Sequence, residues 1–331
     1  MKLGVIGVGS LGKEHARVCA SLPGATLAAV CDASRPRAEE IAAKYGAPAF
    51  SDWRELRGKV DGVIVATPTL IHREVAAYFL EAGIPCLVEK PLAGTVAECE
   101  QMVALARKTN TLLQVGHIER FNPAWLVARP LMGKPRFVNA ERVSAYPFRS
   151  IDIDVVLDLM IHDIDLVLSL ATAPLAHVNA SGTKVLSPTN DLVNARLTFE
   201  DGFVANIVAS RVSPEPGRRF RSFNADGFVD IDLRGRKVSR VTKSEKLKGG
   251  FDVSKVDPAK VANLKELLYG ELLSTETCAV PAGEPLALED GAFVEAVKAR
   301  KAAAVTGEEG LRAVQVAHRV MEAVAASQRS E

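Results

Sequence analysis

Hydrophobic positions in the first hundred or so residues alternate between short apolar runs and longer amphipathic segments. The apolar runs predict strands at Leu3–Val8, Thr26–Cys31, Gly62–Ala66, Cys86–Glu89 and Leu112–Val115. The amphipathic segments between them predict helices at Leu11–Leu22, Arg35–Tyr45, Leu70–Ala82 and Thr95–Lys108. Continuous Val, Ile and Leu strands separated by helices are typical of a parallel sheet covered on both faces. This part of the chain is therefore predicted to be a doubly wound α/β domain.

After Gly116 the pattern changes to consecutive strands joined by short turns such as Asp201-Gly202. Strands are predicted at Arg136–Ser144, His177–Lys184, Asp191–Phe199, Phe203–Arg211, Phe220–Ala225, Phe228–Leu233 and Lys237–Thr242. Helices are predicted at Pro123–Met132, Val156–Leu170, Pro258–Ser274, Leu288–Ala304 and Glu308–Ser327. Adjacent strands without intervening helices indicate a mainly antiparallel open sheet. We therefore expect an α/β domain over residues 1–120 and an α+β domain over residues 121–331.

The composition is that of an ordinary soluble globular protein, with 48% hydrophobic residues, 24% charged residues and a net charge of +1. Nothing in this balance favours a nucleic-acid or membrane partner. The arginines at 218, 219 and 221 and the basic run at 234–248 are interleaved with acids, so they are expected to be solvated edge and loop charges. The five cysteines form no C-x-x-C pair and are expected to be reduced thiols. With no signal-peptide pattern and no apolar run of about 18 residues, we expect a cytoplasmic protein.

A glycine-rich sequence follows the first predicted strand. Gly7-Val8-Gly9-Ser10-Leu11-Gly12 matches G-x-G-x-x-G, lies between a strand and an amphipathic helix, and is followed by a second strand that ends at Asp32. In this context the pattern predicts a Rossmann dinucleotide site. Gly7 allows the tight turn, Gly9 lets the backbone approach the pyrophosphate, and Gly12 lets helix and strand pack closely. Ser10 and Leu11 complete the turn at the positive end of the helix.

Asp32 is placed to accept hydrogen bonds from the adenosine ribose hydroxyls. Its carboxylate would repel a 2′-phosphate, which favours NAD over NADP. Arg35 and Arg37 lie just beyond it and could hold such a phosphate. NAD is therefore the expected cofactor, with NADP left open.

Two further motifs follow predicted strands, at the edge where open α/β sheets bind ligands. One contains Thr67 and Pro68, and the other is Glu89-Lys90-Pro91. A lysine directly after a buried strand is a candidate catalytic cation, and Glu89 could position it or compensate its charge. His72 is expected to line the adenosine side of the cleft. The histidines at 15, 177 and 318 have no ligand-like spacing and are expected to be structural.

The second half of the chain contributes the acid-rich segment 158–165 on a predicted helix. Asp158 and His162 are four residues apart and share a helix face, and Asp165 lies nearby. A carboxylate one turn away can orient an imidazole and raise its basicity, which suits a proton acceptor. His162 could instead be a structural histidine. A metal site is disfavoured because no second histidine lies close enough to complete a ligand set.

Taken together, these motifs resemble the glucose-fructose oxidoreductase, inositol dehydrogenase and MocA family over essentially the whole chain. The resemblance rests on the glycine fingerprint, on Val88–Pro91, on the D-x-x-x-H pattern at 158–162 and on residues 304–317. It implies that Lys90 binds and polarises the reacting oxygen and that His162 takes or donates the hydroxyl proton. Asp158 would orient His162 or bind substrate. The family often has glycine where this chain has Met160, which would narrow the pocket.

The segment Gly116–Pro123, together with the Asp158 helix, resembles the UDP-N-acetylglucosamine 3-dehydrogenases within that family. The resemblance implies oxidation at C3 of a UDP-amino sugar, with a free sugar or inositol-type substrate as the alternative. Arg120 and Asn122 would contact cofactor, sugar or diphosphate, but Arg120 could equally form an interface salt bridge. His117 is expected to be a local structural hydrogen-bonder.

The resemblance also implies a homodimer or homotetramer. The chain could instead be a regulator that binds NAD but catalyses no reaction. The presence of both Lys90 and His162 argues against this alternative.

Overall fold

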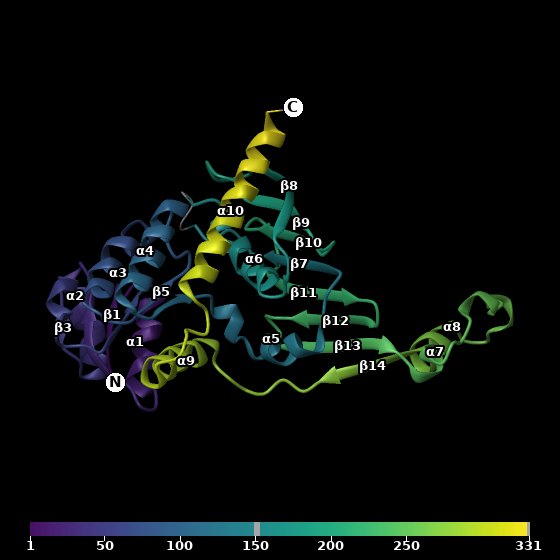
Figure 1. Cartoon of the computed structure of the whole chain (residues 1–331), viewed down its shortest axis with the longest axis horizontal. Helices are drawn as coiled ribbons and strands as arrows, with labels where there is room; N and C mark the ends of the chain where they lie inside the picture. The colour runs from purple at the N-terminus through teal and green to yellow at the C-terminus, as the bar shows by residue number, and fades with distance from the viewer. Residues whose placement is uncertain (149–152, 330–331) are drawn as a thin grey trace. The chain divides into compact units, whose positions relative to one another are not determined.

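The computed structural model describes residues 1–148 and 153–329, and these residues form two compact units (Figure 1). Unit 1 takes its described residues from Met1–Asn122, Val156–Leu168 and Gly283–Glu322. Unit 2 takes them from Pro123–Val155, Ser169–Ala282 and Ala323–Glu331. The units are therefore not continuous in sequence. The segment that carries Asp158 and His162 belongs to the same compact unit as the glycine-rich turn.

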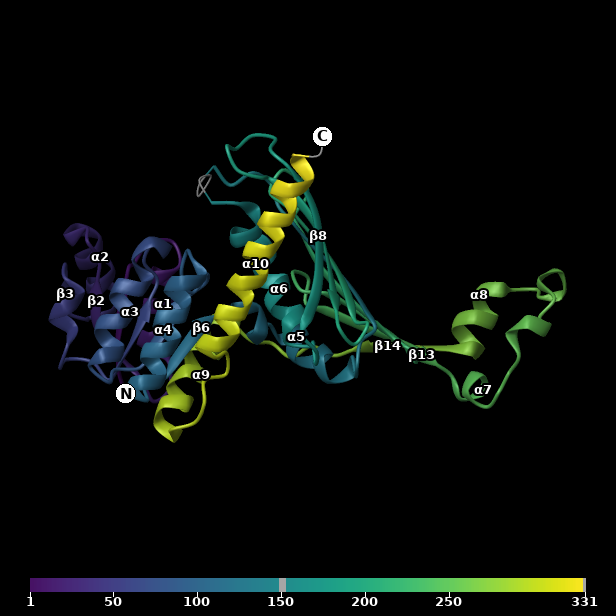
Figure 2. The ribbon, with the colours of Figure 1, turned by 45° about the horizontal axis from the view of Figure 1, so that its top comes forward.

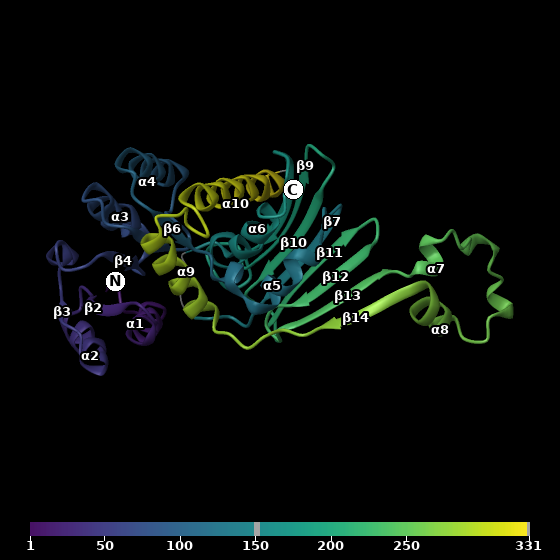
Figure 3. The ribbon, with the colours of Figure 1, turned by 60° about the horizontal axis from the view of Figure 1, so that its bottom comes forward.

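Unit 1 is built on a parallel sheet with the order β3-β2-β1-β4-β5-β6. Its strands are β1 Lys2–Ile6, β2 Thr26–Cys31, β3 Ala49–Phe50, β4 Gly62–Val65, β5 Cys86–Glu89 and β6 Leu113–Gly116. The crossover helices are α1 Gly12–Ser21, α2 Arg35–Tyr45, α3 His72–Glu81 and α4 Val96–Thr109. α1 and α2 cover one face of the sheet, and α3 and α4 cover the other (Figure 3). Side chains of β1, β4 and β5 are buried throughout their apolar runs. The predicted doubly wound Rossmann architecture is confirmed.

Further helical segments complete unit 1. They are η1 Trp53–Leu56, η2 Thr69–Ile71, η3 Ile118–Phe121, the π-helical turn η5 Val156–Met160, α6 Ile161–Leu168, α9 Pro285–Ala299 and α10 Gly307–Gln328, whose last residues belong to unit 2. α9 packs against α1 and η3. α9 thus covers the helix that follows the glycine-rich turn, although His15 of α1 and Asp290 of α9 are 275 residues apart in sequence.

Unit 2 is built on a sheet with the order β14-β13-β12-β11-β7-β10-β9-β8. Figure 2 shows this sheet close to edge-on. Its strands are β7 Phe137–Val143, β8 Leu175–Thr183, β9 Leu192–Phe199, β10 Val204–Ser210, β11 Gly217–Asn224, β12 Gly227–Asp232, β13 Lys237–Lys243 and β14 Leu273–Cys278. Neighbouring strands are antiparallel except β7 and β10, which run parallel. The short helical segments are α5 Pro123–Ala128, η4 Arg129–Leu131, α7 Glu245–Lys248, η6 Val253–Lys255, η7 Pro258–Lys260, α8 Leu264–Glu266 and η8 Leu267–Leu272. The predicted mainly antiparallel sheet is confirmed.

The predicted helix at Pro258–Ser274 was wrong. The region contains short helical turns, and the chain then enters β14, which pairs with β13 at the edge of the sheet. Asn263 accepts a hydrogen bond from the backbone of Glu266, so it caps a new short helix in the middle of the predicted one. β14 is mostly exposed, and its sequence therefore lacks the apolar alternation that would have predicted a strand.

Candidate active site

The glycine-rich turn has the geometry that close approach of a phosphate group needs. Gly7 has a φ of +82°, a conformation that L side chains rarely adopt. A Cβ on Gly12 would lie 1.7 Å from the carbonyl oxygen of Gly7, so only glycine fits there. A Cβ on Gly9 would meet none of the described residues within 4 Å, which leaves open space beside the backbone. Ser10 and Leu11 are exposed on the same turn. These residues fit a dinucleotide pyrophosphate at the start of α1.

Asp32, directly after β2, is tied to the same turn. One carboxylate oxygen accepts a hydrogen bond from the backbone nitrogen of Val8 at 2.9 Å. The other accepts one from the backbone nitrogen of Ser34, also at 2.9 Å. Arg37 approaches this carboxylate, with 3.6 Å between Nη1 and Oδ1. Asp32 is therefore held rigidly where the sequence predicted a ribose contact.

A hollow of about 400 Å³ opens beside Asp32. It is lined by Ile6, Gly7, Gly9, Cys31, Asp32, Ala33, Arg37, Ser51, Trp53, Ala66, Thr67, Pro68 and Ile71. The lining combines the glycine turn, the acid after β2 and the loop after β4, so it suits the adenosine half of a dinucleotide. Arg35 is not among these residues, and its guanidinium binds Glu39 at 2.6 Å.

His72 joins the loops that follow β4 and β5. Its ring is 1% exposed, and its Nε2 and Nδ1 lie 2.8 Å from the carbonyl oxygen of Thr67 and 3.1 Å from that of Pro91. Burial lowers the pKa of His72, so its ring is neutral and donates from one nitrogen only. Pro68 is exposed on the same loop. The structure thus places His72 beneath the loops, and its expected contact with the cofactor stays a prediction.

Lys90 lies at the end of β5, joined to Pro91 by a cis peptide bond. Its Nζ donates a hydrogen bond to the carbonyl oxygen of Asp158 at 2.7 Å and lies 3.7 Å from the Asp158 carboxylate. The side chains of Lys90 and Asp158 are 18% and 27% exposed, so both are largely desolvated yet reachable. The structure therefore brings together two of the predicted catalytic residues from segments 68 residues apart.

Asp158 belongs to the π-helical turn, and half-buried His162 lies in the first turn of α6 that follows it. π-helical turns inside helices often occur at functional sites. The carboxylate of Asp158 faces Lys90, and the carboxylate of Asp165 binds Arg120. The expected role of Asp158 in orienting His162 stays a prediction. Asp158 and Asp165 are therefore each engaged by a cation of the protein itself.

The two residues predicted to contact substrate have partners inside unit 1. Arg120 binds both carboxylate oxygens of Asp165, at 2.6 and 2.8 Å, and reaches Glu309 at 3.3 Å. Its side chain is only 12% exposed. Asn122 is buried and donates a hydrogen bond to Glu119 at 2.9 Å. The salt-bridge alternative for Arg120 thus has direct geometric support, and contacts of Arg120 and Asn122 with substrate stay predictions.

His117, at the end of β6, is not the local hydrogen-bonder that the sequence suggested. It is 1% exposed, and neither ring nitrogen has a hydrogen-bond partner among the described residues. Burial lowers its pKa, so the ring is neutral. The expectation was wrong because no local acceptor reaches the ring.

Sequence reasoning also missed a buried charged cluster behind Lys90. His15 of α1 lies between Asp290 of α9 and Glu89, with 2.9 Å from its Nδ1 and Nε2 to the two carboxylates. Glu289 lies in the same cluster, with ligand atoms of His15, Glu289 and Asp290 within 4.8 Å of one another. Both imidazole nitrogens already bind carboxylates, so none is left for a metal ion. The available signal was the acidic pair 289–290 in the middle of the mainly apolar first half of the helix sequence.

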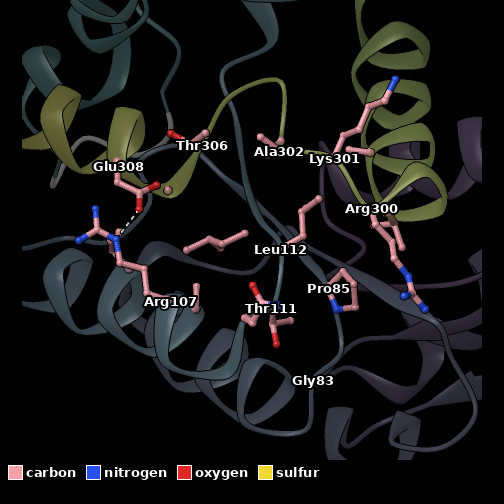
Figure 4. A pocket seen from close by; sticks show the side chains of 18 residues that line it. Gly83, Pro85, Arg107, Thr111, Leu112, Arg300, Lys301, Ala302, Thr306 and Glu308 are labelled. Carbon is pink, nitrogen blue, oxygen red and sulfur yellow. Dashed lines mark hydrogen bonds and ion pairs between the residues drawn. The ribbon is translucent and has the colours of Figure 1, made fainter.

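A larger hollow of about 620 Å³ lies elsewhere in unit 1 (Figure 4). It is lined from the starts of β5 and β6, where Pro85 and Leu112 lie, and from Arg300 and Lys301 beyond α9. Arg107 and Glu308 pair on its wall at 2.7 Å. None of the predicted site residues lines it. This hollow therefore lies at the amino ends of the strands, whereas the candidate site residues lie at their carboxyl ends.

Comparison with known proteins decides the family. A family model described as "Oxidoreductase family, NAD-binding Rossmann fold" matches residues 1–117, and one described as "GFO/IDH/MocA C-terminal domain" matches residues 126–228. The UDP-N-acetylglucosamine 3-dehydrogenase of Acidithiobacillus ferrooxidans is 41% identical over 234 residues, 70% of this chain and 74% of that protein. The chain belongs to the glucose-fructose oxidoreductase, inositol dehydrogenase and MocA family. Its prediction as an NAD-binding dehydrogenase is confirmed.

Further relatives and solved structures show how far the similarity extends. The solved structure of the Acidithiobacillus enzyme superposes with a TM-score of 0.86 at 34% identity, covering 98% of both chains. A scyllo-inositol 2-dehydrogenase of Bacillus subtilis is 30% identical over 233 residues, 65% of this chain and 68% of that protein. A levoglucosan dehydrogenase solved with NADH shares the fold at 18% identity, with a TM-score of 0.81. The Acidithiobacillus and Bacillus relatives, both at least 30% identical, are named as dehydrogenases of a UDP-sugar and of an inositol.

Several expectations concern the redox state of the cysteines, the location of the protein in the cell and its partners. In the described part of the chain the cysteines form no disulfide, and those at 19, 31, 86 and 99 are buried. Among the described residues, no helix has both the length and the apolarity needed to cross a membrane. The cytoplasmic location, the homo-oligomer and the absence of a nucleic-acid partner stay predictions.

Proposed function

We propose that this chain oxidises a secondary alcohol of a nucleotide-activated amino sugar, with C3 of UDP-N-acetylglucosamine as the reacting carbon and NAD as the acceptor. The observation that carries the proposal is the pairing of Lys90 with Asp158 one turn before His162. The choice of sugar is supported by the extent of similarity to the Acidithiobacillus enzyme, which spans nearly the full length of both chains.

Loss of hydride from an alcohol carbon requires loss of the hydroxyl proton as well. His162 accepts that proton, and the ammonium of Lys90 stabilises the negative charge that develops on the oxygen. Bound NAD supplies the acceptor for the hydride. In the structure described here Lys90 is held by the carbonyl and carboxylate of Asp158. A substrate hydroxyl would replace one of these contacts of the Lys90 ammonium with Asp158.

The cofactor end of the site follows from the same geometry. The turn at Gly7 to Gly12 would hold the pyrophosphate, and Asp32 would bind the adenosine ribose. Because Asp32 is buried and fixed by two backbone N–H groups, it cannot move aside for a 2′-phosphate without losing both hydrogen bonds. This arrangement supports NAD as the acceptor. Thr67 and Pro68 would close the adenosine side of the hollow.

The test is an NADH-absorbance assay with purified protein, NAD or NADP, and a ketone trap. UDP-N-acetylglucosamine, other UDP-sugars, inositol and free sugars are offered separately. We expect turnover with UDP-N-acetylglucosamine and its loss, by about 10²-fold or more, in Lys90→Met and His162→Gln. Lys108→Met, at an exposed lysine of α4, is the matched control and should keep full activity.

Isotope labelling identifies the carbon. Deuterium placed at C3 of the sugar should appear in the reduced nicotinamide and slow turnover, whereas deuterium at C4 should remain in the product. Turnover with inositol or a free sugar instead would overturn the nucleotide-sugar assignment while keeping the mechanism. NAD binding without turnover of any substrate would favour the non-catalytic regulator.

A further inference from the structure

The buried charged cluster lies directly behind the residue that carries the proposed catalytic cation. Glu89 precedes Lys90 in sequence, is 6% exposed, and ends β5. One of its carboxylate oxygens accepts a hydrogen bond from His15 at 2.9 Å, and the other accepts one from the backbone nitrogen of Lys90 at 3.1 Å. Glu89 thus connects the imidazole to the main chain of the lysine itself.

His15 connects three elements that the sequence places far apart. It lies on α1, the helix that begins at the glycine-rich turn, and it is fully buried. Its Nδ1 binds Asp290 of α9, 275 residues away, and its Nε2 binds Glu89 of β5, 74 residues away. The imidazole therefore fixes the helix of the cofactor site against the strand end of the catalytic site.

The charge state of the imidazole follows from its partners. Carboxylates accept hydrogen bonds, so both ring nitrogens act as donors only when the ring is protonated. Burial alone would lower the pKa of His15, but the carboxylates of Asp290 and Glu89 raise it well above its usual range. Glu289 and Cys19 also face this region, and burial raises the pKa of both groups, which keeps them neutral. Burial also raises the pKa of Asp290, and the hydrogen bond and charge of His15 oppose that rise. The geometry, with an acid 2.9 Å from each ring nitrogen, favours an imidazolium between the two carboxylates.

The space around Glu89 leaves no alternative position for its carboxylate. Gly116 of β6 pairs with Glu89 across the sheet, and a Cβ at this glycine would lie 2.9 to 3.0 Å from the Glu89 carboxylate group. The absence of a side chain at 116 is what admits the carboxylate. The carboxylate is therefore confined by the imidazole, the lysine backbone and the neighbouring strand.

We propose that His15 is a positioning residue for Lys90, because it holds Glu89 and with it the end of β5 in place against the cofactor helix. This inference rests on the proposed role of Lys90 in alcohol oxidation. Small displacements of a positioned group reduce rates strongly, so a loosened Glu89 affects turnover more than binding.

The test compares His15→Gln with the double variant His15→Gln/Asp290→Asn. A glutamine can donate to Glu89 but would turn its carbonyl oxygen toward the Asp290 carboxylate. The asparagine in the double variant supplies a donor for that oxygen, so the chain of hydrogen bonds from position 290 to Glu89 is complete again. We expect kcat to fall about 10- to 100-fold in the single variant, with the KM for NAD changed less than about threefold, and to recover at least partly in the double variant. His318→Gln, a histidine of unit 1 bonded to the carbonyl of Gly94, is the matched control and should keep full activity.

A second readout does not depend on turnover. The rate at which an amine-reactive reagent labels Lys90 is measured against pH by peptide mass spectrometry in all variants. We expect His15→Gln to shift the midpoint of this profile upward, because Glu89 then lies beside Lys90 without its imidazolium. The double variant should move it part of the way back, because it removes the negative charge of Asp290 from the same cluster. If wild type oxidises no substrate, the proposed function fails, and the labelling profile still decides the role of His15. The inference would be overturned if His15→Gln lowered only the stability. In that case kcat per folded molecule and the labelling profile of Lys90 would both be unchanged.

Discussion

Replacement of Arg120 by methionine tests whether this residue is structural or contacts the substrate. Its guanidinium lies 2.6 and 2.8 Å from the two carboxylate oxygens of Asp165, whose side chain is 1% exposed. Removal of one partner from a buried ion pair costs about 3–5 kcal/mol, because the other charge stays buried without compensation. The guanidinium is 12% exposed, so water can reach part of the vacated site. We therefore expect the free energy of unfolding to fall by about 3 kcal/mol, near the lower end of that range.

Urea unfolding followed by tryptophan fluorescence measures this loss, because Trp53 lies in the same unit as Arg120. Arg120→Met/Asp165→Leu should recover most of the stability, since apolar replacement of both partners of a buried pair is often neutral. Arg107→Met is the matched control. Its pair with Glu308 has side chains 69% and 46% exposed, so its loss should cost less than about 1 kcal/mol.

The sequence alone left open a contact between Arg120 and the substrate diphosphate. In that case Arg120→Met would keep its free energy of unfolding and raise the KM for the UDP-sugar. Unchanged stability with a raised KM would refute the reasoning from the ion pair. Lowered stability with an unchanged KM in the folded fraction would exclude the diphosphate contact.

Further predictions concern four single substitutions, three in the cofactor site and one at a buried acid. Asp32→Ala should raise the ratio of kcat/KM for NADP to that for NAD by about tenfold or more, because a like charge near the 2′-phosphate is removed; an unchanged ratio would exclude Asp32 from this discrimination. Gly12→Ala should lower the free energy of unfolding by at least about 1–3 kcal/mol, since its Cβ would lie 1.7 Å from the carbonyl oxygen of Gly7. Gly9→Ala, which meets none of the described residues within 4 Å, should leave the melting temperature nearly unchanged but weaken NAD binding in a fluorescence titration; equal destabilisation by both alanines would contradict this assignment. Burial raises the pKa of Glu289 well above its usual range, so the native state retains a proton that the unfolded chain loses, and stability falls as pH rises above about 4.5. Glu289→Gln should reduce that slope by up to about 1.4 kcal/mol per pH unit in urea unfolding between pH 6 and 9, and equal slopes would contradict a protonated Glu289.

The strands and helices of the Rossmann unit could be predicted because each buries a continuous or periodic set of apolar side chains. β2, β5 and α2 begin and end where the sequence pattern placed them. β3 contains two half-buried residues and β14 is an exposed edge strand, so neither has an apolar pattern that differs from that of a loop. A strand that buries few apolar side chains shows no clear periodic pattern in the sequence.

The cofactor half of the site was predictable for a related reason. The close packing of Gly12 depends on Gly7, and the position of Asp32 depends on Val8, 24 residues away, so a strand–turn–helix unit fixes their geometry locally. The catalytic half depends on contacts across the chain. The sequence could nominate Lys90 and Asp158 separately, but their pairing requires that residues 156–168 pack with the N-terminal unit.

The buried cluster shows where sequence reasoning about charge reaches its limit. A charged residue is by default assigned to the surface, because burial without a partner is too costly. Whether a partner exists depends on the tertiary structure, and for His15 it lies 275 residues away on α9. Of the two buried acids on that helix, Asp290 is hydrogen-bonded by the imidazole of His15, whereas burial raises the pKa of Glu289 and keeps it protonated. The sequence can thus show that such a residue is able to donate, accept or carry charge. Its role follows only from the structure, because distant segments form its surroundings.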